Sequence, residues 1–148
     1  MVSAIVPVYN EERYIAECLD SLLKQTMRID EIICINDAST DQSSQIIKDY
    51  AIKNDNIYLL ENLRNKGLSF SRNLGIANAH GDYLFFIDSD DVAHLDAIEQ
   101  LYSQAEKHDT DLVYFDLDCI NENGCVEEST RDKFLFEGFS EDEVFAGH

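Results

Sequence analysis

Short apolar runs and segments with helical periodicity alternate along the first 115 residues. Four runs are typical of strands, at residues 2–8, 31–35, 57–60 and 83–87, the first of them buried, and a fifth is expected at residues 112–115. Between them, apolar positions recur at helical spacing and predict helices ending near Gln25, around Ile47, over residues 69–79, and from Leu95 to Ala105. This alternation predicts an α/β fold, a three-layer sandwich with a mostly parallel central sheet.

Polar residues directly follow each predicted strand. They are Tyr9-Asn10-Glu11, Asn36-Asp37, Asn62 and Asp88-Ser89-Asp90-Asp91. Open sheets of this kind bind ligands at the carboxyl ends of their strands, so these residues are expected to surround one crevice. Asn10 is also expected to cap the first helix, with Glu11 and Glu12 at the positive end of its dipole.

The Asp88–Asp91 segment carries three carboxylates in four residues. In an extended segment, residues two apart point the same way, so Asp88 and Asp90 are expected to address one site. Two carboxylates about 5 Å apart repel by roughly 3 kcal/mol at an effective dielectric of about 20, and Mg²⁺ or Mn²⁺ removes that cost. The alternative is a solvated loop in which Asp90 or Asp91 caps the next helix.

The net charge of −19 restricts the possible partners. A chain this acidic repels nucleic acid, anionic membranes and anionic substrates, unless a cation intervenes. Residues 83–87, the longest apolar run, are far shorter than the roughly 20 residues of a membrane span. Without a recognisable signal peptide the protein is expected to be cytoplasmic, and peripheral membrane association of a full-length protein stays open.

Four motifs in order resemble the GT-A-fold glycosyltransferases of family 2, which bind nucleotide-diphospho-sugars. They run from Ile5 to Glu11, from Ile35 to Asp41, from Asn65 to Asn73, and from Gly81 to the DXD-like Asp88–Asp91 segment. The resemblance covers residues 2 to about 116. It implies that residues 1–116 form the nucleotide-sugar-binding core and that residues 117–148 begin an acceptor-side region that is truncated here.

The resemblance also implies roles for individual residues. The nucleotide would be contacted by Pro7, Val8, Tyr9, Glu11, Asp37, Lys66, Arg72, Asp88 and Ser89. Asp37 would accept a hydrogen bond from the uracil ring N–H, and Lys66 and Arg72 would pair with the pyrophosphate or with the acidic segment. Asp90, with Asp88 sharing the ion or touching the ribose, would hold Mn²⁺ or Mg²⁺.

Each residue also has a simpler interpretation. Pro7 is also typical of a strand-end turn, Tyr9 of a packing aromatic and Asp37 of a turn. Lys66 and Arg72 are alternatively surface cations. Ser39, Thr40 and Asp41 are expected to cap the second helix.

The implied activity is transfer of a sugar, with inversion, from a UDP-sugar to an unidentified glycan, lipid or protein acceptor in bacterial cell-surface polysaccharide synthesis. The general base is expected to lie outside this chain, because Glu141-Asp142 reads as a helix start. Two alternatives remain: a nucleotide-sugar-binding module without activity, and a nucleotidyltransferase. The first turn has no glycine, which disfavours the nucleotidyltransferase.

Overall fold

The computed structural model describes residues 1–115 and 118. It divides into two compact units, Met1–Glu99 and Gln100–His148, and the first unit contains the sheet. The acceptor-side region expected from residue 117 onward, with its helix start at Glu141-Asp142, lies outside the described residues except for Asp118. The predicted domain boundary at residue 116 therefore stays a prediction.

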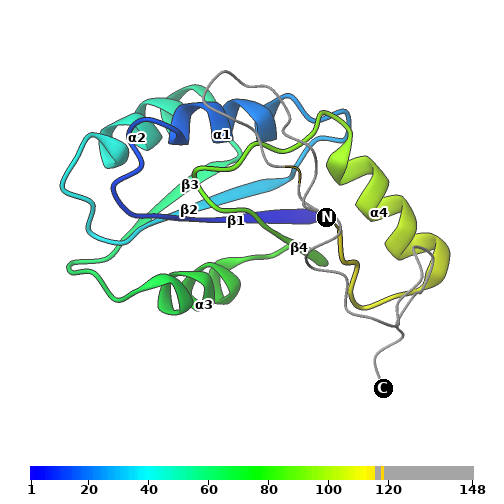
Figure 1. Cartoon of the computed structure of the whole chain (residues 1–148). Helices are drawn as coiled ribbons and strands as arrows, with labels where there is room; N and C mark the ends of the chain where they lie inside the picture. Colours follow the sequence, from blue (N-terminus) through cyan, green and yellow to red (C-terminus); the bar gives the residue numbers. More distant parts are fainter. Residues whose placement is uncertain (116–117, 119–148) are drawn as a thin grey trace. The chain divides into compact units, whose positions relative to one another are not determined.

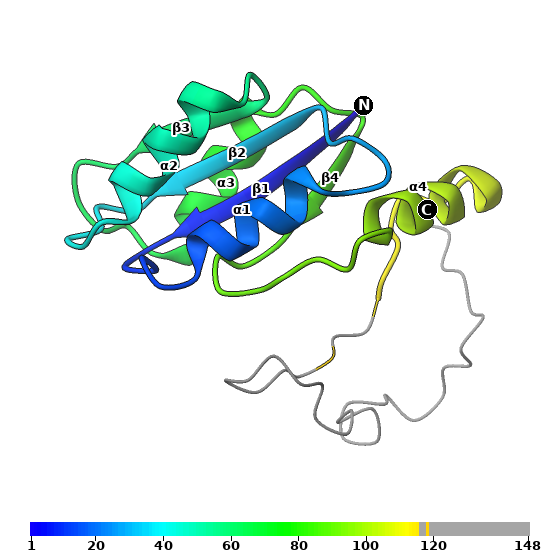
Figure 2. The same ribbon diagram turned by 90° about the horizontal axis from the view of Figure 1, so that it is seen from above.

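The centre of the first unit is a four-stranded, all-parallel sheet (Figures 1 and 2). Its strands are β1 (Val2–Val8), β2 (Glu31–Asn36), β3 (Ile57–Glu61) and β4 (Tyr83–Phe86), in the order β3-β2-β1-β4. All seven residues of β1 are buried because helices cover both faces of this central strand. The predicted parallel α/β sheet is confirmed.

Helices form a layer on each side of this sheet (Figure 1). α1 (Ile15–Leu23) and α2 (Ser43–Lys53) cover one face, and α3 (Leu68–Asn78) covers the other. A Cβ at Gly75 would lie 2.6 Å from Ile5 Cγ2, so only glycine at this position allows α3 to sit this close to the sheet. The three-layer sandwich is confirmed, and α4 (Ala97–His108) follows it along the chain.

Three local predictions were wrong. Asn10 does not cap α1, which begins at Ile15 after Tyr14, because Asn10 adopts a left-handed backbone with φ 59°. Ser39 and Thr40 do not cap α2, whose N-cap is Gln42, although the Asp41 carboxylate accepts the Ser43 N–H at 2.9 Å. Residues 112–115 form no strand, since no described strand pairs with their backbone.

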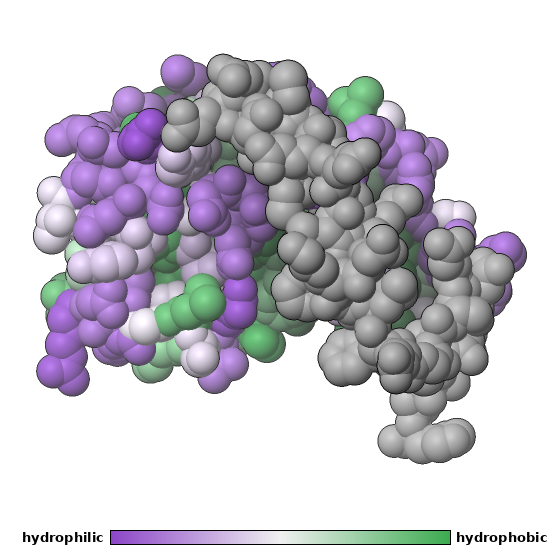
Figure 3. All heavy atoms as spheres, in the orientation of Figure 1, coloured by the Kyte–Doolittle hydropathy of each residue, from purple (hydrophilic) through white to green (hydrophobic). Residues whose placement is uncertain are grey.

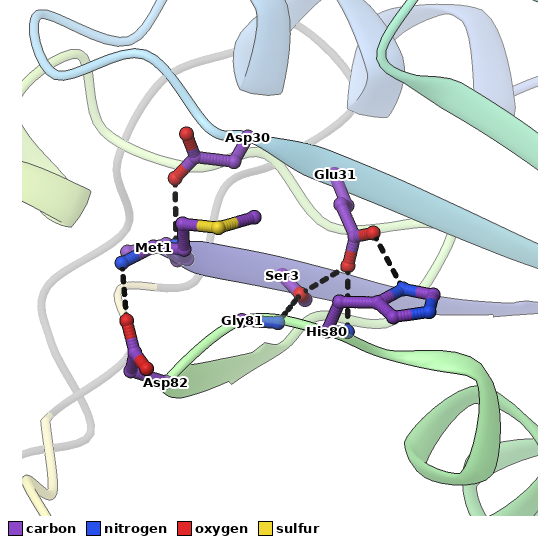
Figure 4. Close-up of polar contacts among 8 residues, drawn as sticks. Met1, Ser3, Asp30, Glu31, His80, Gly81 and Asp82 are labelled. Atoms are coloured by element: carbon purple, nitrogen blue, oxygen red, sulfur yellow. Dashed lines mark hydrogen bonds and ion pairs between the residues drawn. The ribbon is translucent and has the colours of Figure 1, made fainter.

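The amino ends of the strands carry a polar cluster (Figure 4). We call it the amino-end cluster; it comprises Met1, Ser3, Asp30, Glu31, His80, Gly81 and Asp82. The Glu31 carboxylate accepts hydrogen bonds from Ser3 Oγ at 2.6 Å and from His80 N at 2.9 Å, and it contacts His80 Nδ1 at 2.8 Å. Ser3 Oγ in turn accepts the Gly81 N–H at 2.9 Å, so these contacts join β1, β2 and the start of β4.

Candidate functional site

A cleft of about 280 Å³ opens at the carboxyl ends of β1 and β2, within the first unit. It is lined by Pro7, Val8, Tyr9, Glu11, Asp37, Asn65, Gly67, Leu68, Ser71, Asp88, Ser89 and Asp90. The visible surface around the turns after β1 and β2, on the left of Figure 3, is mainly hydrophilic. The cleft thus brings together every predicted site residue except Lys66 and Arg72.

A larger hollow of about 570 Å³ lies beside the carboxyl ends of α1 and α2. Its lining includes Arg28, Lys53 and Asp55, and an ion pair of 2.9 Å already joins Arg28 to Asp55. It contains none of the predicted site residues. The smaller cleft is therefore the better candidate, because ligands of parallel α/β sheets bind at the carboxyl ends of the strands.

Reciprocal hydrogen bonds join the turn after β1 to the turn after β2. They are Asn10 N to Ser39 Oγ, Glu11 N to Ser43 Oγ, Glu12 N to Asp41 Oδ2, Thr40 N to Asn10 Oδ1 and Gln42 N to Glu12 Oε2, at 2.8–3.0 Å. Asn10 and Ser39 serve in this network in place of the predicted helix caps. The network fixes the backbone on which Tyr9 and Glu11 enter the cleft.

The Asp37 carboxylate is bound by its own chain. Asp37 is only 3% exposed, and its carboxylate accepts hydrogen bonds from Asn62 Nδ2 at 2.7 Å, Lys66 N at 2.9 Å and Gly67 N at 2.7 Å. Gly67, with φ 87°, occupies the N-cap of α3. Asp37 therefore stabilises the turn between β3 and α3. Sequence reasoning identified Asn62 only as a polar residue after a strand and missed this contact.

The acidic segment after β4 forms a turn, with a hydrogen bond from Asp91 N to Asp88 O at 3.1 Å. The prediction that alternation along an extended segment aligns Asp88 with Asp90 was therefore wrong. Both still line the cleft, because the turn directs them there. Ser89 is buried and Asp90 is exposed.

Negative charge accumulates across the cleft from this turn. Burial raises the pKa of Glu11, with Asp90 and then Asp41 adding to the effect. Burial, then Asp90 and Asp88, also raises the pKa of Asp91. A bound cation would favour the ionised form of these groups.

The same carboxylates affect the pKa of the Cys18 thiol, which lies in α1. Its Sγ lies 3.7 Å from the Asp88 carbonyl oxygen. Burial, followed by Asp91, Asp90 and Asp88, raises the pKa of Cys18 to about 12. Such a thiol stays protonated at neutral pH and is a poor nucleophile.

The two predicted basic residues sit beside the cleft. Arg72 Nη2 pairs with Asp88 Oδ1 at 2.6 Å, and its buried Nε has no partner among the described residues. Lys66 Nζ instead lies 4.0 Å from the centre of the Phe70 ring, a cation–π contact. Arg72 is thus paired with the acidic turn, whereas Lys66, which precedes α3, contacts Phe70 of that helix.

The carboxylates of Asp88 and Asp90 suit a cation whose remaining ligands are substrate phosphates and water. The described part of the chain has no group of three or more His, Cys, Asp or Glu residues able to hold a metal ion. Mg²⁺-type ions are commonly bound by one or two carboxylates, with substrate phosphates and water completing the shell. Asp90 and Asp88 fit that arrangement. Arg72 already pairs with Asp88, and the raised pKa values of the neighbouring Glu11 and Asp91, to which Asp90 contributes, favour binding of a further cation.

Comparisons with known proteins identify a family that this chain matches. Residues 3–141 match the model of the family described as glycosyl transferase family 2. A poly(ribitol-phosphate) beta-glucosyltransferase of Bacillus spizizenii is 40% identical over 126 residues, covering 83% of this chain and 20% of that protein. The chain spans 17% and 46% of two further curated relatives, both glycosyltransferases of Streptococcus pneumoniae.

Two solved structures share the fold. S. aureus TarS 1-349 in complex with UDP-GlcNAc matches with a TM-score of 0.76 and 32% identity, covering 84% of this chain and 36% of that one. A mannosyltransferase from Pyrobaculum calidifontis, in complex with GDP-Man and Mn²⁺, matches with a TM-score of 0.58 and 28% identity, covering 62% and 28%. The predicted GT-A-like fold is confirmed.

No helix in the described residues is long and apolar enough to span a bilayer. The cytoplasmic location and the peripheral membrane association of a full-length protein stay predictions.

Proposed function

Because this chain belongs to glycosyltransferase family 2, we propose that its cleft binds a nucleoside-diphosphate sugar, with UDP as the nucleotide. The observation that carries the proposal is the convergence of Pro7–Glu11, Asp37 and the acidic turn on one cleft at the carboxyl ends of the strands. Complexes of S. aureus TarS with UDP and with UDP-GlcNAc support the choice of nucleotide. The full-length protein would transfer the sugar to an acceptor.

The apolar side of the cleft would hold the nucleoside. Pro7, Val8 and Tyr9 line it, and Tyr9 is 47% exposed and available to a planar ring. Glu11 would lie near the ribose. Asp37 would accept the uracil ring N–H, a contact that a base without that donor does not make.

The acidic side would hold a divalent cation and the diphosphate. Asp90, with Asp88, would bind Mn²⁺ or Mg²⁺, and Ser89 would complete this edge of the nucleotide site. The cation supplies charge neutralisation for the leaving diphosphate. Arg72 is held at the same edge by Asp88 and offers its planar fork to phosphate, with Lys66 as a second, more distant cation. The Mn²⁺ complex of the mannosyltransferase relative supports this assignment.

Sugar transfer would also need a general base. We place the general base, which takes the proton from the acceptor hydroxyl, outside these 148 residues. The 148-residue chain would then bind nucleotide and transfer nothing, so detectable sugar transfer by it contradicts this part of the proposal. Inversion at the anomeric carbon and a role in cell-surface polysaccharide synthesis belong to the full-length protein; the B. spizizenii relative supports the latter.

Calorimetric titration of the purified chain tests the binding proposal. UDP, GDP and CDP are titrated with Mn²⁺, and again with EDTA in its place. We expect UDP to bind in Mn²⁺ at least about tenfold more tightly than GDP or CDP, a difference of about 1.4 kcal/mol, and all binding to weaken in EDTA. Failure of all three nucleotides to bind contradicts the proposal, and metal-independent UDP binding contradicts the role of the cation.

Two other functions can be distinguished from the proposed one, the first by a transfer assay and the second by the same titration. A module without activity binds the nucleotide equally well, but its full-length protein transfers no sugar. A nucleotidyltransferase binds a nucleoside triphosphate more tightly than UDP and releases pyrophosphate. Including UTP in the titration therefore separates the last function from the proposed one.

A further inference from the structure

Asp37, directly after β2, is a buried carboxylate whose hydrogen-bond donors come from the end of β3 and from the turn between β3 and α3. An ionised carboxylate offers about four acceptor positions, and its burial is costly unless these are filled. Three donors of the chain reach it: Asn62 Nδ2, Lys66 N and Gly67 N, with the Lys66 N–H shared between both oxygens at 2.9 and 3.0 Å. The carboxylate is therefore nearly saturated before any ligand arrives.

Asn62 is the only one of these donors that is a side chain. Its backbone N–H bonds to Asn36 O at 2.9 Å, which fixes Asn62 at the end of β3 beside β2. Its side-chain amide then reaches Asp37 Oδ1 at 2.7 Å. Without this amide, Oδ1 keeps only its share of the Lys66 N–H, and nothing from β3 restrains the carboxylate.

The Asp37 carboxylate in turn sets one wall of the cleft. It holds the N–H groups of Lys66 and Gly67, and Gly67 begins α3 in a backbone region that favours glycine. Asn65, Gly67 and Leu68, around this contact, all line the cleft. A displacement of Asp37 therefore displaces the wall that faces Asp88 and Ser89.

We propose that Asn62 is a positioning residue for nucleotide binding: its side-chain amide orients Asp37, which places the 65–68 wall of the cleft. This inference rests on the proposed function, namely that the cleft binds a nucleoside diphosphate. Asn62 itself is not required to touch the ligand. Its contribution is transmitted through the hydrogen bond that Asn62 Nδ2 donates to Asp37 and through those that Asp37 accepts from Lys66 N and Gly67 N.

The first test compares Asn62→Ala with Asn54→Ala. Asn54 is a matched control, because its side-chain amide also donates one hydrogen bond, to Tyr50 O at 2.9 Å, but at the end of α2 away from the cleft. UDP affinity is measured by calorimetry in Mn²⁺, and stability by urea unfolding. We expect Asn62→Ala to weaken UDP binding about tenfold, as expected for the loss of one hydrogen bond to a charged group, and Asn54→Ala to leave binding unchanged.

A second variant, Asn62→Asp, adds a pH readout that a purely structural role would not give. Below about pH 5 the new carboxyl group can carry a proton and donate a hydrogen bond to the Asp37 carboxylate. At higher pH the two carboxylates repel each other. We expect the ratio of variant to wild-type UDP affinity to rise as the pH falls from 8 to 5. This variant also tests the idea if Asn62→Ala does not fold.

The outcomes separate this inference from the function on which it rests. If the wild-type chain binds no nucleotide, the proposed function fails and this inference fails with it. If wild type binds UDP and Asn62→Ala binds it equally well, only the role of Asn62 is overturned. An Asn62→Asp deficit that is identical at pH 5 and pH 8 also overturns it, as does an equal loss of affinity in Asn54→Ala.

Discussion

The two ends of the same parallel sheet use carboxylates in opposite ways. At the amino end, Glu31 is matched by donors from Ser3 and His80: burial acts to raise its pKa, but these hydrogen bonds outweigh it and the pKa is lowered. At the carboxyl end, burial and neighbouring carboxylates raise the pKa values of Glu11 and Asp91. The Glu31 carboxylate at the amino end is thus matched by donors. At the carboxyl end Asp37 and Asp88 also have partners, but the pKa values of Glu11 and Asp91 are raised.

This difference separates a structural polar cluster from a binding site. Hydrogen-bond donors around a buried carboxylate offset the cost of its desolvation, and these hydrogen bonds link neighbouring strands. Carboxylates that face each other without matching cations reduce stability and are retained where a ligand supplies the missing charge. The amino-end cluster is thus expected to affect folding, and the acidic turn to affect binding.

The largest expected effect is the loss of nucleotide binding in Asp90→Ala. Removing a metal-binding carboxylate should weaken Mn²⁺-dependent UDP binding at least about a hundredfold, since even partners that only support metal ligands contribute up to that factor. Calorimetry in Mn²⁺ measures the change. Asp55→Ala, which removes a carboxylate paired with Arg28 away from the cleft, is the control and should bind UDP normally. Normal binding by Asp90→Ala would contradict the contrast between the two ends.

The reverse pattern is expected for Glu31→Ala at the amino end. The variant loses charge-assisted hydrogen bonds from Ser3 and His80, so we expect the free energy of unfolding to fall by about 2 kcal/mol, with UDP affinity unchanged. Urea unfolding at pH 7 measures the change. The exposed Glu17, replaced by alanine, should show no comparable loss.

The lowered pKa of Glu31 also predicts how its contribution to stability changes with pH. A carboxyl group whose pKa is lowered by folding contributes stability above its ordinary value of 4.5, and this contribution is lost as the pH falls below that value. The stability difference between wild type and Glu31→Ala should therefore shrink on acidification below about pH 4.5. A difference that grew would show that Glu31 is not held by these donors.

A smaller effect of opposite sign is expected for Asp91→Asn at the carboxyl end. Folding raises the pKa of Asp91, so its ionisation costs stability as the pH rises above its ordinary value of 3.8. The amide removes that cost, and the variant should melt slightly higher than wild type at pH 7 but not at pH 3.5. Thermal unfolding at both pH values, without divalent cations, tests this. A lower melting temperature at pH 7 would mean that the folded protein stabilises the ionised Asp91 carboxylate, contrary to this prediction.

The smallest effect is expected for Asp82→Asn, also at the amino end. The Asp82 carboxylate pairs with the Met1 ammonium group at 2.8 Å, but their side chains are 77% and 53% exposed. Exposed ion pairs contribute little because water screens them, so neither the melting temperature nor UDP binding should change measurably. A clear loss of stability would show that the amino-end cluster acts as one cooperative network.

The sequence by itself determined the elements and the end of the sheet that binds. Apolar runs at residues 2–8 and 57–60 correspond to β1 and β3, because a short run of β-branched and apolar residues favours a strand. Parallel strands place their carboxyl ends at one edge, so residues far apart in sequence, such as Tyr9 and Asp88, were predicted to meet and do line one cleft.

Only the tertiary structure decided how those residues are held. Asn10 was expected to cap its own helix, but its side chain binds Thr40, 30 residues away. Asp37 was expected to face a ligand and does line the cleft, but the sequence did not show that its carboxylate also accepts hydrogen bonds from Asn62, Lys66 and Gly67. Side-chain oxygens of Asn and Asp accept any suitably placed N–H, so the sequence specifies that a donor is needed, whereas the packing of distant turns determines which donor arrives.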